Sequence, residues 1–371
     1  MNLVIVESLE KLKQFHHLLD GVEGKWRVAT TLGPLRVLPR LVASANPPAF
    51  TPDYEPAPTV FINRRPLKAD EIIQNLKRDI ASAKSVYIAT DPDDAGELAA
   101  WHIRETLGVE RAQRIVFAQS EHISILDAIH QARDIDMPVV RSEEARRVAD
   151  QLISYRSASP MSKLTGIKKL MIRRISCLAL KLVVEREALI RSQSQTAQKS
   201  LARYGDSDLA RDMTKRFGVR QEDLSELSLH LFSQAYCAKK PDETGKLAWH
   251  PTPSGEKIIL ALTSRFHFIQ EKHALDLERN LERVRGGKIE YTKVIQMVYN
   301  LLEQDISAMH GEITALFGTS SGKVYFCRCG KPMVKRQAKS GINAGKIFWG
   351  CSGFPSCTRT ANHDPDNDCP R

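Results

Sequence analysis

The chain has 371 residues, 42% of them hydrophobic, and its 54 Lys and Arg residues exceed its 44 Asp and Glu residues by ten. This composition excludes a disordered polar chain and indicates about two to three globular domains. The excess positive charge favours a polyanionic partner, either DNA or RNA.

Further exclusions come from the apolar runs and the cysteines. No run of eighteen apolar residues occurs, and the opening segment MNLVIVESLEKLKQF meets charge too early for a signal peptide. We therefore expect a cytoplasmic protein. Five of the seven cysteines follow residue 326, and such clustering in an intracellular chain favours metal binding over disulfides.

The first part of the chain alternates predicted strands with predicted helices. LVIVES (3–8), KWRVAT (25–30), SVYIAT (85–90) and RIVFA (114–118) are predicted strands, with helices between them and a proline-rich loop at 47–66. Such alternation predicts an α/β domain with a mostly parallel sheet, ending near residue 137.

The pattern then changes to long helices. Residues 138–310 are predicted to form an α-helical domain that is rich in Lys and Arg, with breaks at SASP (157–160) and at 239–255. Residues 320–362 are predicted to form short strands and turns around the clustered cysteines, and 363–371 are predicted to form a tail.

Acidic residues follow two predicted strands of the α/β domain. Glu7 ends the first strand, and Asp91 and Asp93 follow SVYIAT. Ligands collect at the carboxyl ends of parallel strands, so these carboxylates are expected to converge. Carboxylates repel one another without a cation between them, and oxygen ligands suit Mg²⁺ or Mn²⁺. A solvated turn at a helix start is the alternative.

Longer strings carry a family resemblance. VIVES, GPLRVLP (33–39) and ATDPDDAGELAAWHI (89–103) resemble, in order and form, the TOPRIM domain of type IA DNA topoisomerases. EEARRVADQLISYRSASP, RRISCLALKLVVERE and HPTPSGEKIILAL are similar to helices that follow in that family. The resemblance implies a bacterial-type topoisomerase-like protein associated with the nucleoid or a plasmid, with single-stranded DNA as its partner.

The resemblance also implies roles for individual residues. Glu7 is implied as metal ligand or general acid, Asp91 and Asp93 as the metal pair, and Glu97 as a further Mg²⁺ ligand. One acid of the family cluster is replaced by Ala95, which implies weaker metal binding. Lys11 and Arg174 are implied at the catalytic phosphate. The implied DNA-binding residues are Lys11, Arg36, Arg146, Arg147, Lys168, Lys169, Arg173 and Arg174.

The nucleophile of the family has no clear counterpart. The family's tyrosine lies in a string of the form Tyr-Pro-Arg-Thr-Asp-Ser, which this chain lacks. Alignment places Lys239 at that position, with Tyr236 the nearest candidate and Tyr204 further away. Both tyrosines are interpreted as ordinary core or surface residues. Near 193–250 this chain is much shorter than the family, and the missing segment corresponds to most of the family's gate. A partner protein would therefore have to supply a gate for strand passage.

The carboxy-terminal cysteines resemble a zinc ribbon. Cys327 and Cys329 are separated by one residue, and Cys351 and Cys357 by five, with twenty-one residues between the pairs. Four thiolates in this pattern predict a tetrahedral Zn²⁺ site. Trp349 beside basic residues offers a stacking surface for a base, although it could equally fill the ribbon core.

Three functions remain open from the sequence. The first is a shortened type IA topoisomerase-like isomerase that binds DNA and Mg²⁺. The second is a noncatalytic DNA-binding accessory protein. The third is a TOPRIM nuclease, in which metal-bound water replaces the tyrosine.

Overall fold

A computed structural model describes residues 1–38, 54–57, 60–62, 65–117, 125–167, 170–193, 201–224, 227–242, 245–317, 327, 333–338, 347–351, 354–355 and 357–361. The chain divides into two compact units. The first unit comprises Met1–Pro39, Thr51–Val148 and Asn280–Lys293, and the second comprises Arg40–Phe50, Ala149–Arg279 and Val294–Arg371. No helix among the described residues is long and apolar enough to cross a membrane.

The first unit is built on a four-stranded sheet in the order β2-β1-β7-β8. All neighbouring strands are parallel: β2 (Trp26–Thr30), β1 (Asn2–Val6), β7 (Ser85–Ile88) and β8 (Gln113–Arg114). The predicted parallel α/β domain is therefore confirmed. β8 covers only the start of the predicted strand RIVFA.

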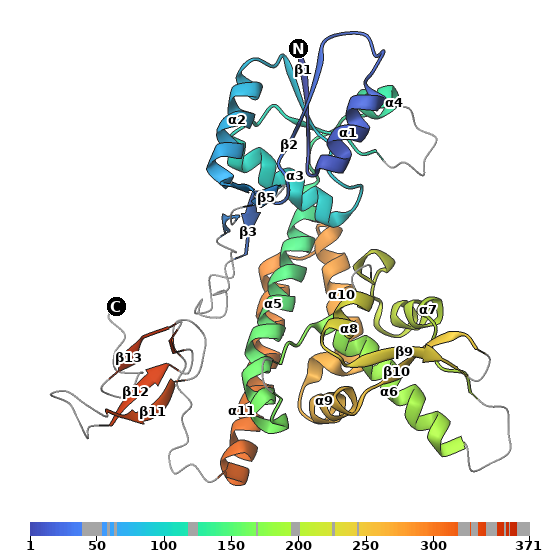
Figure 1. Ribbon diagram of the computed structural model, residues 1–371, viewed down its shortest axis with the longest axis vertical. Coiled ribbons are helices and arrows are strands. Elements are labelled where there is room, and N and C mark those ends of the chain that lie inside the picture. Colours follow the sequence, from blue (N-terminus) through green and yellow to red (C-terminus); the bar gives the residue numbers. More distant parts are fainter. Residues whose placement is uncertain are drawn as a thin grey trace. The chain divides into compact units, whose positions relative to one another are not determined.

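Helices cover both faces of this sheet because successive side chains of a strand point to opposite sides. Leu3 and Ile5 of β1 pack with α2 (Ala69–Ala81) and α3 (Asp94–Leu107). Val4 and Val6 pack with α1 (Leu9–Leu18) and α4 (Ile125–His130). Figure 1 shows α2 and α1 on opposite sides of the strands.

Short antiparallel strand pairs lie within and beside the region predicted as a loop at 47–66. β3 (Arg36–Val37) pairs with β4 (Glu55–Pro56), and β5 (Val60–Ile62) pairs with β6 (Arg65–Leu67). The loop prediction is therefore wrong for Glu55–Pro56, for Val60–Ile62 and for the part of β6 that lies within 47–66. The strands are only two or three residues long, too short for an alternating pattern to indicate them.

Helix α5 (Met137–Thr165) has residues in both units and continues through Pro160, so the predicted break at SASP is wrong. Proline lacks a backbone N–H, which leaves the carbonyl of Arg156 without its helical donor. Ile153 and Met161, on either side of this point, are fully buried. Burial of this helix face offsets the missing hydrogen bond.

The second unit is largely helical where it is described, as predicted. Its helices are the end of α5, then α6 (Arg174–Gln193), α7 (Asp206–Phe217), α8 (Leu227–Ser233), α9 (Pro253–Thr263), most of α10 (Glu271–Arg285) and most of α11 (Tyr291–Phe317). Two 3-10 segments, Gln221–Leu224 and His267–Ile269, connect them.

The predicted break at 239–255 is an antiparallel hairpin of β9 (Cys237–Pro241) and β10 (Leu247–Pro251). Thr252 then caps α9, because its Oγ1 accepts a hydrogen bond from the Gly255 N–H at 3.1 Å. Three antiparallel strands follow near the end of the chain: β11 (Met333–Gln337), β12 (Ile347–Cys351) and β13 (Thr360–Ala361).

Candidate functional site

Two acids and a lysine meet at the carboxyl edge of the parallel sheet. Glu7 follows β1 and Asp91 follows β7, and these strands are neighbours in the sheet. Lys11 lies in the first turn of α1, which Ser8 caps. The Lys11 Nζ is 2.7 Å from Glu7 Oε1 and 2.6 Å from Asp91 Oδ1. One ammonium therefore bridges two carboxylates from positions far apart in the chain.

The two carboxyl groups differ in proton affinity. Burial raises the pKa of Glu7 above its usual value, although the Lys11 ammonium opposes this effect. Burial also acts to raise the pKa of Asp91, but hydrogen bonds with Lys11 and Glu7, together with the lysine charge, hold that pKa below its usual value. Glu7 is therefore the group that keeps a proton more readily, and Asp91 is the more persistent anion.

Asp93 has a structural contact in addition to its predicted role. It is the N-cap of α3, and its Oδ1 accepts a hydrogen bond from the Gly96 N–H at 2.7 Å. A Cβ at Gly96 would lie 2.0 Å from the Asp91 carbonyl oxygen, which only glycine avoids. The turn that presents Asp91 is therefore fixed by the start of α3. The third predicted carboxylate is used at least partly as a helix cap.

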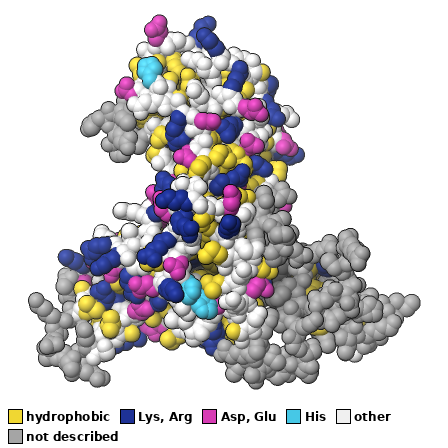
Figure 2. Space-filling model, turned by 180° about the vertical axis from the view of Figure 1, so that it is seen from behind, with side chains coloured by type: hydrophobic (Ala, Val, Ile, Leu, Met, Phe, Trp, Pro, Cys, Tyr) yellow, Lys and Arg dark blue, Asp and Glu magenta, His cyan; other side chains and the backbone are white. Residues whose placement is uncertain are grey.

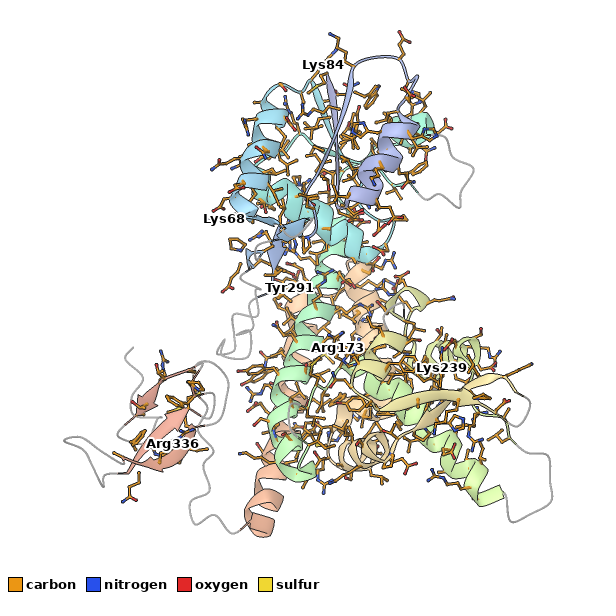
Figure 3. The ribbon with its side chains drawn as sticks, in the orientation of Figure 1. Lys68, Lys84, Arg173, Lys239, Tyr291 and Arg336 are labelled. Carbon is orange, nitrogen blue, oxygen red and sulfur yellow. The ribbon has the colours of Figure 1, made fainter. Side chains whose placement is uncertain are left out.

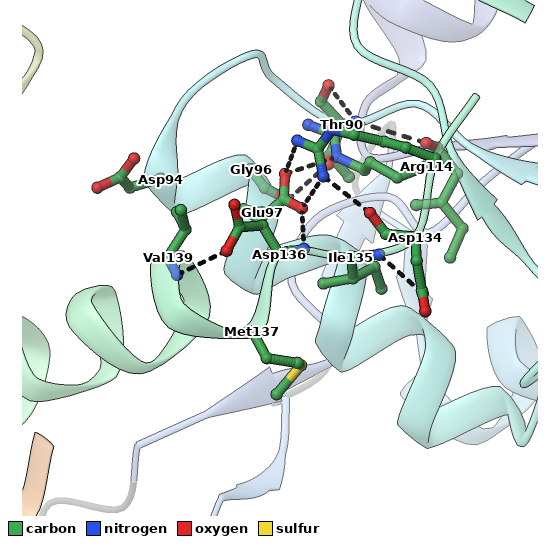
Figure 4. A network of polar contacts seen from close by, with 12 residues as sticks. Thr90, Asp94, Gly96, Glu97, Arg114, Asp134, Ile135, Asp136, Met137 and Val139 are labelled. Atoms are coloured by element: carbon green, nitrogen blue, oxygen red, sulfur yellow. Dashed lines mark hydrogen bonds and ion pairs between the residues drawn. The ribbon is translucent and has the colours of Figure 1, made fainter. Parts of the chain in front are cut away.

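Glu97 is enclosed by basic and backbone donors (Figure 4). Its side chain is 4% exposed and pairs with Arg114 at 3.2 Å and with Arg133 at 2.8 Å. Its Oε1 also accepts the Asp136 N–H at 2.7 Å. Burial acts to raise the pKa of Glu97, but the contacts of Arg133, Asp136 and Arg114 lower it.

This geometry does not support the prediction that Glu97 is a metal ligand, because both of its oxygens already accept from arginines. Arg114 also donates from Nη2 to the Asp91 carbonyl oxygen at 2.5 Å, so the pair supports the loop that carries Asp91. Asp94 does not replace the acid missing at Ala95, because its buried side chain pairs with Arg285 at 3.3 Å.

The residues at the sheet edge fit a small divalent cation in chemistry. Glu7 and Asp91 present hard oxygens, and both already hold one cationic group, the Lys11 ammonium. Three carboxylates do not converge as predicted. Within the described part of the chain, the group of three ligand atoms within 4.8 Å of one another consists of cysteines only. Glu7 and Asp91 are the residues on which a metal site would be centred.

The two neighbouring arginines of the second unit have opposite environments. Arg173 is exposed where α6 begins (Figure 3). The Arg174 side chain is 0% exposed and lies 2.5 Å from both Asp150 and Glu278. Those carboxylates raise the pKa of Arg174, although burial alone would lower it. Arg174 is therefore a buried ion-pair residue, which does not support its predicted contact with DNA through an open surface.

A cavity of about 320 Å³ lies beside these arginines within the second unit. Its lining includes Arg173, Arg174, Asp150 and His230. The Arg174 Nη2 and both ring nitrogens of His230 are buried without a hydrogen-bond partner among the described residues. Sequence reasoning missed His230, because a single histidine in a predicted helix carries no signal of a binding site.

The remaining predicted DNA-binding residues have varied environments. Arg147 pairs with Glu143 at 2.9 Å and is 40% exposed at its side chain, whereas Arg146 is largely buried. The Arg36 guanidinium carbon lies over the Tyr54 ring, 5.6 Å from the ring centroid. Two further predicted residues lie outside the described residues: Lys168 and Lys169.

The candidate nucleophiles are buried. Tyr236 is 3% exposed, and its hydroxyl donates to the Met171 carbonyl at 2.9 Å. Burial raises the pKa of Tyr236 to about 12, which disfavours the phenolate that would attack phosphorus. Tyr204 is also buried and donates to Asp212 at 2.6 Å. Lys239, on β9, pairs with Asp206 at 2.6 Å (Figure 3).

Three cysteines gather at the carboxy-terminal strands. The ligand atoms of Cys327, Cys351 and Cys357 lie within 4.8 Å of one another, and Cys327 Sγ is 3.7 Å from Cys357 Sγ. Thiolates at this spacing fit Zn²⁺ in donor type. The fourth predicted ligand, Cys329, lies outside the described residues. Trp349 packs partly buried against the cysteine group, so it serves the ribbon core at least in part.

Comparisons with known proteins agree with this architecture. The family described as the Toprim domain matches residues 2–120. The chain is similar to "DNA topoisomerase I, plasmid" of Xylella fastidiosa, with 34% identity over 193 residues, or 52% of this chain and 27% of that protein. The chain thus spans about a quarter of the length of this curated relative. Full-length topoisomerase I from Thermotoga maritima has a similar fold, with a TM-score of 0.66 and 14% identity over 98% of each chain.

Proposed function

We propose that this chain, a type IA topoisomerase-like protein with a Toprim domain, binds single-stranded DNA and holds Mg²⁺ at its Toprim sheet edge. The observation that carries the proposal is the convergence of Glu7 and Asp91 on the Lys11 ammonium, at the carboxyl ends of β1 and β7. The Toprim match over residues 2–120 and the net charge of +10 support it.

Each residue has a distinct role in this proposal. Mg²⁺, when bound by Glu7 and Asp91, would neutralise charge on a phosphodiester. Lys11 would contact a phosphate oxygen, since its ammonium already lies at this edge. As the alternative to metal binding, Glu7 would hold a proton for a leaving oxygen, because burial raises its pKa. Arg173 and Arg147 would contact the DNA backbone, since both side chains reach the surface.

Lys and Arg side chains are numerous on the face drawn in Figure 2, where Asp and Glu side chains are interspersed among them. Binding dominated by phosphate contacts should weaken with salt, because neutralised phosphates release their counterions. The zinc ribbon would add a second contact, with Trp349 offering part of its ring to a base and Zn²⁺ held by Cys327, Cys329, Cys351 and Cys357.

A noncatalytic accessory protein is the second candidate. Tyr236 favours this candidate, because its hydroxyl is buried, donates to the Met171 carbonyl and is therefore not presented to DNA as a nucleophile. A protein partner would then provide the gate and tyrosine for strand passage. The metal-dependent nuclease requires no tyrosine and is distinguished by its products.

One experiment separates these functions. A 3′-labelled single-stranded oligonucleotide, whose label stays on the strand that a 5′-phosphotyrosyl link would hold, is incubated with the protein and Mg²⁺, and the reaction is stopped with denaturant. A covalent adduct absent from Tyr236→Phe would indicate topoisomerase chemistry, and free nicked ends absent from Asp91→Asn would indicate a nuclease. Salt-sensitive binding without either product would indicate the accessory function. Failure to bind the oligonucleotide at low salt would refute the proposal.

The basic surface is tested by charge reversal. Arg147→Glu should weaken oligonucleotide binding and flatten its salt dependence, measured by fluorescence anisotropy. Arg78→Glu, an exposed arginine on α2, is the control for the same type of charge change. Equal affinity of Arg147→Glu and Arg78→Glu would exclude Arg147 from the DNA-binding surface.

A further inference from the structure

The Lys11 ammonium lies where a divalent cation would have to bind. It contacts Glu7 at 2.7 Å and Asp91 at 2.6 Å, and these are the carboxylates on which the metal site is centred. The Asp91 N–H also donates to Glu7 Oε1 at 3.2 Å, which holds the two acidic residues together. An ammonium and a dication compete for the same oxygens and repel each other, so both cannot be held there at full strength.

We propose that Lys11 is an internal counter-cation that holds the metal position in the free protein and moves to a DNA phosphate on binding, so that DNA and divalent metal reinforce each other's binding. This inference deepens the proposed function and rests on it. It assigns Lys11 a regulatory part in metal binding, beyond contact with phosphate.

The other acids explain why one ammonium is sufficient to compete. Ala95 supplies no carboxylate, and Glu97 is engaged by Arg114 and Arg133. Asp93 is engaged at Oδ1 by the Gly96 N–H. The site is therefore centred on two carboxylates rather than a larger set, and a lysine bound to both opposes most of the attraction for a metal ion.

Geometry also allows the lysine to leave. The Lys11 side chain is 19% exposed and its partner Asp91 is 55% exposed, so a phosphate can approach from solvent. The flexible four-carbon stem lets the ammonium turn to a phosphate oxygen without movement of α1. Its departure exposes two carboxylates without a cation between them, which attract a dication. Linkage requires the converse, so that metal binding strengthens phosphate binding by the same factor.

The test measures Mn²⁺ affinity by isothermal titration for the wild type, Lys11→Met and Lys13→Met. Lys13 is exposed on the same helix, so its substitution removes an equal charge nearby. Without DNA, Lys11→Met should bind Mn²⁺ about tenfold more tightly than the wild type, because the Lys11 ammonium no longer competes with Mn²⁺ for Glu7 and Asp91. Lys13→Met should match the wild type.

A saturating single-stranded oligonucleotide should then tighten Mn²⁺ binding by the wild type by a larger factor than by Lys11→Met, with the oligonucleotide alone titrated as the blank. Mn²⁺ should likewise raise the melting temperature of Lys11→Met more than that of the wild type. Lys11→Gln is the second variant should Lys11→Met fail to fold.

The outcomes separate this inference from the proposed function. If Lys11→Met and Lys11→Gln bind Mn²⁺ no more tightly than the wild type, the counter-cation role of Lys11 is overturned. The proposed metal site is still supported in that case if Glu7→Gln abolishes Mn²⁺ binding. Absence of Mn²⁺ binding from every protein, with oligonucleotide present, refutes the proposed metal site itself and with it the inference.

Discussion

Substitution of Arg174 tests whether this arginine holds the second unit together or contacts DNA. Arg174→Met keeps the side-chain length but removes the charge between Asp150 and Glu278. Loss of one partner from a buried ion pair destabilises a fold by about 3–5 kcal/mol, because the remaining charge stays desolvated. Glu278, with a side chain 6% exposed, accounts for most of this cost, since Asp150 is 35% exposed and can regain water.

The assay is hydrogen exchange of peptides from α6 and α10 in increasing urea, which reports opening of the second unit alone. Arg173→Met is the matched control, because this neighbour is exposed and its substitution should change stability by no more than about 0.5 kcal/mol. The control should instead weaken oligonucleotide binding.

A double variant separates pairing from packing. Glu278→Met added to Arg174→Met removes the desolvated charge, so it should recover about half or more of the lost stability, as replacement of buried pairs by apolar residues does. Exchange unchanged in Arg174→Met, together with a loss of DNA affinity, would refute the structural role and restore the contact predicted from the sequence.

Three further predictions concern other residues. His102 is buried, and burial lowers its pKa to about 3, whereas the pKa of histidine in the unfolded chain is about 6.5. As the pH falls from about 6.5 towards 3, the unfolded chain binds a proton that the folded chain does not, so the first unit should lose stability. His102→Phe should flatten this pH dependence of the urea midpoint. Gly96→Ala should destabilise the first unit by several times the cost of exposed Ala95→Ser, measured by thermal unfolding, since its Cβ would meet the Asp91 carbonyl. Equal melting temperatures of Gly96→Ala and Ala95→Ser would show that the turn at Asp91 can relax to accept the added Cβ. Cys351→Ser should lower zinc content from about one per chain to none by elemental analysis, whereas Cys177→Ala should retain it.

The candidate site depends on interactions at two levels of sequence separation. The Glu7–Lys11 pair is local, four residues apart at the start of α1. The Asp91 contact with Lys11 and the Glu97 contacts with Arg114 and Arg133 join distant parts of the first unit. These contacts pair acidic side chains at and beneath the sheet edge with basic ones before any ligand binds, so Lys11 matters for metal binding as well as for phosphate.

The sequence by itself determined the α/β domain, the sheet edge that carries Glu7 and Asp91, and the approach of three cysteines. The first two features follow from local hydrophobic periodicity and from the rule that parallel strands end at one edge, and the cysteine group follows from the spacing of metal-binding cysteines. Only the tertiary structure decided that Arg174 is buried beside exposed Arg173, and that Glu97 belongs to two arginines. Adjacent arginines are chemically identical in a sequence, and their environments depend on residues such as Glu278 that packing brings from far along the chain.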